Sequence, residues 1–177
     1  HSRGWIGHPA LRGHRSGKSV ANWFACKHVD AKHDSATITL EDKTAGLEIS
    51  IQYLLDAHGI LKVNSKVTNI ADGDYTLEHL LNWLPLAPQA DEILDFYGHW
   101  TKERQPQRRE IGYGLTTREG FEGRSGHDYT ITQIALTKAT NFNQGEAWSM
   151  GVAWSGNNIH HVEKLIDRSK SIGAGEY

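Results

Sequence analysis

The chain has 177 residues, with 19 Lys and Arg, 21 Asp and Glu, and a formal net charge of −2. This length suits one domain with a sizeable core and is short for two domains. A charge this close to zero lacks the basic surface that a nucleic acid or an anionic membrane attracts, so we expect neither partner.

The sequence predicts a protein of a reducing compartment. Its single cysteine, Cys26, cannot form an internal disulfide. No run approaches the roughly 20 apolar residues that span a bilayer, and the opening HSRGWIGHPA lacks the charged-then-apolar order of a secretion signal. We therefore expect a cytoplasmic location.

From His33 onward the apolar residues recur with a period of two, which is typical of half-buried strands. The turn sequences DAHG (56–59) and ADGD (71–74) separate the later strands. Strands are predicted in SATITLED (35–42), LEISIQY (47–53), ILKVNSKVTN (60–69) and YTLEHLLNWL (75–84). The result is an antiparallel meander.

Further along, EAWSMGVAW (146–154) alternates bulky with small side chains. The small face suits close packing against a second sheet, so we predict an all-β fold, an antiparallel β-sandwich, as one domain over residues 1–177. NNIHHVEKLI (157–166) fits both helix and strand spacing. The first thirty-odd residues and the segment 105–124 are expected to be rich in loops.

Candidate catalytic carboxylates are few. On a strand, Asp91 and Asp95 would point the same way and lie roughly 13 Å apart, which is too far for a glycosidase pair. We interpret both as solvated acids on a strand edge.

Metal and triad chemistry are not supported either. His160 and His161 are adjacent, so on a strand they point to opposite faces. Ser125, His127 and Asp128 lie too close in sequence to fold into triad geometry, and no G-x-S-x-G elbow is present. We expect no metal and no cofactor.

Aromatic and charged residues remain. Trp148 and Trp154 lie at strand spacing and are interpreted as core, whereas Trp5 and Trp23 lie in loop-like surroundings and could stack on sugars. The segments 99–114 and 116–128 mix both charge signs densely. Such charges either brace loops through ion pairs or form a solvated face.

The order of several motifs resembles the N-terminal domain of glycoside hydrolase family 36, the bacterial-type α-galactosidases. The motifs are GHWTKERQPQRREIGYGL (98–115), GRSGHD (123–128), WSMGVAWSGN (148–157) and a terminal AGE. The opening GWIGHPALRGHRSG (4–17) resembles the matching loop of actinobacterial-type members. The resemblance covers nearly the whole chain.

The resemblance implies a β-supersandwich like that of galactose mutarotase, carried by a retaining α-galactosidase that hydrolyses melibiose- or raffinose-type galactosides. Such enzymes keep both catalytic Asp residues in a (β/α)8 barrel, and this sequence has no Lys-Trp-Asp and no alternating βα pattern. We therefore expect a non-catalytic fragment without the barrel, inactive alone. Its expected partners are the barrel domain of the same parent chain, galactosides bound by the intact enzyme, and further copies in a homo-oligomer.

The resemblance also implies roles for residues. An early family loop reaches towards a galactose pocket, and here the matching loop, Gly4 to Gly17, departs from the usual Gly-Asp-aromatic-Arg pattern. We predict that Trp5, His14 and Arg15 contact the sugar. We predict domain-bracing roles for Arg104, Arg108, Arg109, Arg124, His127 and Asp128. The alternatives are a free-standing carbohydrate-binding module and a mutarotase-like enzyme.

Overall fold

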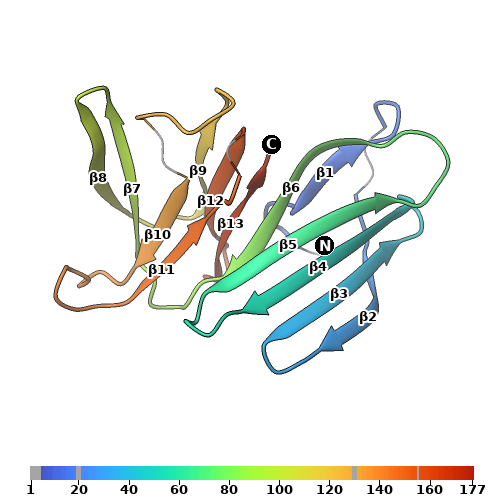
Figure 1. The fold of residues 1–177 in the computed structure, drawn as a ribbon, viewed down its shortest axis with the longest axis horizontal. Coiled ribbons are helices and arrows are strands. Elements are labelled where there is room, and N and C mark those ends of the chain that lie inside the picture. Colours follow the sequence, from blue (N-terminus) through green and yellow to red (C-terminus); the bar gives the residue numbers. More distant parts are fainter. Residues whose placement is uncertain (1–4, 19–20, 129–130, 155) are drawn as a thin grey trace. The chain divides into compact units, whose positions relative to one another are not determined.

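The structure is a computed structural model that describes residues 5–18, 21–128, 131–154 and 156–177 (Figure 1). The elements of these residues are all β-strands. They are β1 (Leu11–His14), β2 (Ala25–Ala31), β3 (Ser35–Asp42), β4 (Leu47–Leu55), β5 (Leu61–Asn69), β6 (Thr76–Pro85), β7 (Glu92–His99), β8 (Lys102–Glu110), β9 (Gly114–Gly120), β10 (Thr132–Leu136), β11 (Ala147–Gly151), β12 (Asn158–Lys164) and β13 (Lys170–Glu176).

Strand pairs are antiparallel in both compact units into which the chain divides. The first unit comprises His1–Trp5 and Leu11–Asn82, and the second comprises Ile6–Ala10 and Trp83–Tyr177. The predicted all-β antiparallel fold class is confirmed. Within the described ranges, no helix is long and apolar enough to cross a membrane.

The first unit contains a sheet with the order β2-β3-β4-β5. Its register places Leu40 opposite Ile49, and Ile49 opposite Val67, so the predicted alternation gathers apolar side chains on one face. Around this face lies a core of Leu11, Ala45, Leu47 and Ile49, packed by Phe24, Leu40, Ile51, Val67, Tyr75 and Leu80.

The second unit contains a sheet with the order β11-β10-β7-β8 and a run of neighbouring strands β13, β12 and β9. Ala135 of β10 pairs with Ile93 of β7, and both side chains are fully buried. They belong to a core that also holds Leu86, Ala90, Ile111, Val162 and Ile172. This core positions the loops that follow β7 and β9.

Several expectations about local structure were wrong. The segment 105–124, expected to be loop-rich, supplies most of β8 and all of β9, and β1 and β2 lie in the first thirty-odd residues. No single prediction was made for the segment 157–166, which fits both helix and strand spacing; it contains β12, a strand. In β11 the bulky Trp148 and Met150 pack on the core while the small residues are exposed. Trp154, interpreted as core, is 47% exposed.

Candidate functional site

In the second unit, two arginines surround the buried carboxylate of a β7 residue. Asp95 of β7 is 2% exposed, which overturns its interpretation as a solvated edge residue. Arg109 Nη2 donates to Asp95 Oδ2 at 2.5 Å, and Arg118 Nε lies 3.7 Å from the same oxygen. Two guanidinium groups therefore compensate one buried charge, as burial of a carboxylate requires.

Arg118 also connects the buried Asp95 to the loop after β9. Its Nη2 donates to the backbone carbonyl oxygens of Phe96, at 3.1 Å, and Asp128, at 2.7 Å. Gly123 N–H donates to Asn157 Oδ1 at 2.8 Å. The GRSGHD loop is thus held through its backbone at both ends.

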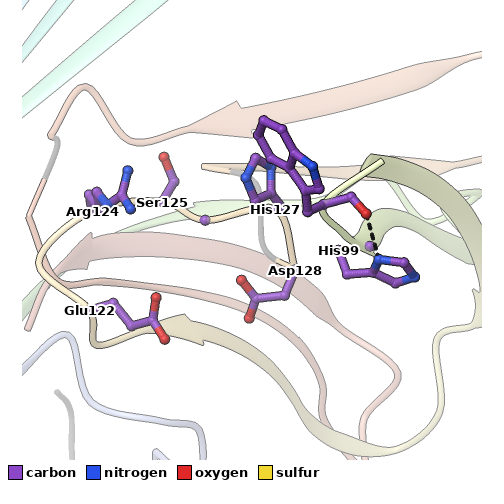
Figure 2. A pocket seen from close by; sticks show the side chains of 9 residues that line it. His99, Glu122, Arg124, Ser125, His127 and Asp128 are labelled. Atoms are coloured by element: carbon purple, nitrogen blue, oxygen red, sulfur yellow. Dashed lines mark hydrogen bonds between the residues drawn. The ribbon is translucent and has the colours of Figure 1, made fainter. Parts of the chain in front are cut away.

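This loop lines a cavity of about 350 Å³ (Figure 2). The lining residues come from the end of β7, the β7–β8 turn and the loop after β9; they are Gly98, His99, Trp100, Glu122, Arg124, Ser125, Gly126, His127 and Asp128. An adjoining cavity of about 470 Å³ shares Gly98 and Asp128 with it, and Tyr97, Thr117, Arg118 and Glu119 complete its lining.

The β7–β8 turn is braced by its own polar groups. Thr101 N–H donates to Glu103 Oε1 at 3.0 Å, and hydrogen bonds from the Glu103 and Thr101 backbone N–H groups lower the pKa of the Glu103 carboxyl. His127 Nδ1 lies 3.6 Å from Glu103 Oε1, and the His127 ring meets the Trp100 ring edge-on at 5.5 Å. His127 therefore connects the two walls of the cavity.

The other arginines with predicted bracing roles differ in their contacts. Arg108 Nη1 donates to the Thr140 carbonyl oxygen at 2.7 Å, and its Nη2 also pairs with Glu92. Arg104 and Arg124 are exposed, and their side chains have no partner among the described residues. Among the arginines of the second unit, Arg108, Arg109 and Arg118 make these side-chain contacts, and nothing in the sequence had singled out Arg118. The domain-bracing roles of Arg104, Arg108, Arg109, Arg124, His127 and Asp128 stay predictions.

The cavity does not have the arrangement of a catalytic triad. Figure 2 shows the Ser125 hydroxyl and the Asp128 carboxylate on opposite sides of the loop. Within the part of the chain that the structure describes, no group of three His, Cys, Asp or Glu residues could hold a metal ion. The site offers acceptors, an aromatic ring and a guanidinium group, which suit binding better than nucleophilic chemistry.

The predicted sugar-contact residues lie in the N-terminal loop, of which Gly4 is outside the described residues. Trp5 is 48% exposed. His14 ends β1, and its Nδ1 accepts the Gly17 N–H at 3.1 Å. Trp23, the alternative stacking platform, is 49% exposed. The contact of Trp5 and His14 with a sugar stays a prediction.

Arg15 has an extensive structural role within the first unit. Its donors reach six acceptors, of which the four nearest are Ala45 O at 3.1 Å, Gly46 O at 3.2 Å, Gly73 O at 3.1 Å and Asn69 Oδ1 at 2.5 Å. The guanidinium also lies 5.5 Å from the centre of the Tyr75 ring. The predicted sugar contact of Arg15 also stays a prediction.

An anchor in the second unit holds the N-terminal segment Ile6–Ala10. The His8 backbone N–H donates to both oxygens of Glu163, each at 3.0 Å. The His161 ring stacks on Trp83 at 5.7 Å and lies 4.8 Å from the His8 ring. No spacing in the sequence signalled this contact, because its partners are 155 residues apart.

Comparisons with known proteins agree with this structure. The model of the glycosyl hydrolase family 36 N-terminal domain matches residues 1–177. An α-galactosidase of Escherichia coli is 32% identical over 171 residues, which are 97% of this chain and 24% of that enzyme. The chain therefore spans about a quarter of the length of such relatives.

Solved structures show the same fold. An AgaA α-galactosidase variant of Geobacillus stearothermophilus in complex with stachyose matches with a TM-score of 0.88 and 19% identity, over 97% of this chain and 27% of that one. A second AgaA variant, in complex with raffinose, has a TM-score of 0.87 and 18% identity, with the same coverage. The chain belongs to the family of glycoside hydrolase family 36 N-terminal domains.

Proposed function

We propose that this chain is the non-catalytic N-terminal domain of a retaining α-galactosidase that hydrolyses terminal α-galactosides of the melibiose and raffinose type. The observation that carries the proposal is the family match over the whole chain. The related AgaA structures hold stachyose or raffinose, two oligosaccharides with a terminal α-galactosyl unit. In this account the catalytic carboxylates belong to a barrel outside these 177 residues.

The domain's first role in this proposal is to complete one side of the galactose pocket. The half-exposed ring of Trp5 supplies a stacking face. The imidazole of His14 and the guanidinium of Arg15 supply polar groups next to it. The bonds from Arg15 to Ala45 O and Gly46 O support this role, because they fix the end of the loop.

Its second role is to support the barrel domain and to contribute to the interface between subunits of a homo-oligomer. We propose that the intact enzyme is cytoplasmic. Arg104 and Arg124 suit this role, because they are exposed and have no partner among the described residues. Arg108, Arg109, His127 and Asp128 brace the surface from within the second unit. An arginine fork pairs well with carboxylates or carbonyl groups of another domain.

Kinetics of the full-length parent protein test the pocket role. Trp5→Ala, His14→Ala and Arg15→Ala should each raise KM for raffinose or lower turnover, with Trp23→Ala as a matched control at an equally exposed tryptophan. Unchanged KM and turnover in all three variants would show that the domain does not contribute to the galactose pocket. Loss of stability without a kinetic change would assign Arg15 a purely structural role.

A free-standing carbohydrate-binding module is the second candidate. The observation in its favour is that Trp5 and Trp23 are both about half exposed. Titration of the 177-residue chain with galactose separates the two candidates. An incomplete subsite should bind galactose very weakly, whereas a binding module should saturate and lose its affinity in Trp5→Ala or Trp23→Ala.

A further inference from the structure

The cavity beside the GRSGHD loop presents an unusually exposed aromatic residue. Trp100 is 73% exposed, although it lies in a turn fixed by several hydrogen bonds. Thr101, a β-branched residue, has a φ of 71°, and Arg104 has a φ of 54°. Residues with a β-carbon rarely adopt a positive backbone φ, because it costs energy. Such backbone strain persists where the surrounding structure holds the residue in place. The turn therefore fixes Trp100 in an exposed position.

Two carboxylates converge on the same cavity. Glu122 Oε2 and Asp128 Oδ1 lie 3.9 and 2.6 Å from the position that a β-carbon on Gly126 would occupy. Figure 2 shows both carboxylates on one side of the loop, and Arg124 on the other side. Neither carboxylate has a hydrogen-bond partner among the described residues. The absence of a side chain at Gly126 leaves room for them.

The adjoining cavity repeats this composition. It contains another exposed aromatic residue, Tyr97, which is 48% exposed, and another exposed acid, Glu119. The two cavities share Gly98 and Asp128 and therefore adjoin; we call them together the groove, and an aromatic side chain, Trp100 or Tyr97, lines each half. Each half lies in the size range of small-ligand sites, about 300 to 1,000 Å³.

The chemistry of these groups selects the class of ligand. An ionised carboxylate only accepts hydrogen bonds, and the hydroxyl groups of a sugar donate them. The C–H face of a pyranose packs on an aromatic ring. A protein surface that docked on this groove would bury Glu122 and Asp128 and would have to compensate both charges, which is costly. The side of the loop that carries these two carboxylates therefore favours a hydroxyl-rich ligand over a protein, whereas Arg124 lies on the other side of the loop and can face another domain.

We propose that this groove is a carbohydrate-binding site in which Trp100 and Tyr97 stack on two pyranose rings of an oligosaccharide and Glu122, Asp128 and Glu119 accept hydrogen bonds from their hydroxyl groups. The site is distinct from the proposed pocket contacts of Trp5, His14 and Arg15. It binds sugar and performs no bond cleavage.

Lactose titration of the full-length protein tests the site. Lactose has two pyranose rings and no α-galactosidic bond, so an α-galactosidase leaves it intact. Trp100→Ala should weaken lactose binding about tenfold, the loss expected when one aromatic contact is removed. Trp100→Phe, which keeps a ring, should restore most of the affinity.

Gly126→Ala tests the same site without removing an aromatic ring. Its methyl group would lie 2.6 Å from Asp128 Oδ1, so the carboxylate must move, and lactose binding should fall several-fold. Gly112→Ala is the matched control, because nothing lies within 4 Å of its β-carbon position, and it should leave binding unchanged.

Two results would overturn the proposal. The first is lactose binding that is absent in the wild type, or equal in the wild type, Trp100→Ala and Gly126→Ala. The second is a Trp100→Ala variant that has a lower melting temperature or dissociated subunits while lactose binding persists, which would make the groove a protein-docking surface.

If Trp100→Ala does not fold, the isosteric variant Glu122→Gln tests the site instead. Several-fold weaker lactose binding in this variant supports the site, and unchanged binding overturns it. All these results are independent of raffinose hydrolysis.

Discussion

Arg118 and Asp128 are joined by a hydrogen bond of 2.7 Å from the guanidinium to the backbone carbonyl oxygen, which leaves the Asp128 carboxylate unconstrained by this contact. The same guanidinium faces the buried Asp95. One side chain therefore links the charge balance inside the second unit to the loop that lines the cavity. This link makes Arg118 the most informative residue to change.

Arg118→Ala should destabilise the chain by about 3 kcal/mol, because it leaves the buried Asp95 with Arg109 as its remaining cationic neighbour and breaks two bonds to backbone carbonyl groups. The measurement is the free energy of unfolding in urea. Lys138→Ala is the control: Lys138 and Glu110 pair at 3.1 Å on the surface, and its loss should have no measurable effect. Equal stability of Arg118→Ala and wild type would contradict this account.

Arg15→Lys should lower the stability of the chain by about 1 to 2 kcal/mol, because a single ammonium group cannot reproduce a guanidinium that reaches Ala45 O, Gly73 O and Asn69 Oδ1 together. Urea unfolding measures the change. Arg12→Lys is the control, because Arg12 makes one exposed ion pair, with Glu78. If both lysine variants behave alike, the bonds of Arg15 do not stabilise the first unit.

Acid should weaken the chain through His160. This residue is fully buried, and desolvation lowers its pKa from 6.5 to about 4, partly opposed by a hydrogen bond with the Ile131 backbone. The unfolded chain then binds the proton first, so the contribution is fully present above pH 6.5 and is lost as the pH falls to about 4. The loss amounts to about 3 kcal/mol.

The measurement is the free energy of unfolding of the wild type and His160→Gln at pH 7, 5.5 and 4.5. The difference between the two proteins isolates this histidine from the carboxyl groups that titrate in the same range. The wild type should lose more stability than the variant on acidification. Parallel curves would show that His160 titrates alike in the folded and unfolded chains.

Gly145→Ala should destabilise the β10–β11 loop by about 2 kcal/mol. Gly145 has a φ of 123°, and a β-carbon there would lie 2.5 Å from Thr140 Cα. Because Arg108 holds the Thr140 carbonyl group, the loop cannot easily retreat. Thermal melting should show the loss in Gly145→Ala and none in Gly112→Ala. Equal melting temperatures would mean that the loop accommodates the methyl group.

The sequence revealed the strands whose two faces differ in polarity. In β3, β4 and β5 the alternation is visible because one face contacts the core of the first unit. β8 carries charged and polar residues on both faces and contains Pro106, so no period of two was evident. Its strand conformation comes from pairing with β7, which is a tertiary effect.

The candidate site was partly predictable. The mixed charges indicated ion pairs, but their partners depend on register: Arg109 lies opposite Ile93, which places it on the face that carries Asp95. The burial of Asp95 could have been inferred, because it is two residues from Ile93 and so shares its face. The contact between His8 and Glu163 could not have been inferred, because no local sequence pattern connects residues so distant in the chain.

The most direct test is the release of galactose from raffinose by the full-length parent protein and by the 177-residue chain alone. The full-length protein should release galactose with retention of configuration at the anomeric carbon, and the isolated chain should release none. A full-length protein that leaves raffinose intact, or an isolated chain that cleaves it, would contradict the proposal that this family 36 domain supports a catalytic centre outside its own residues.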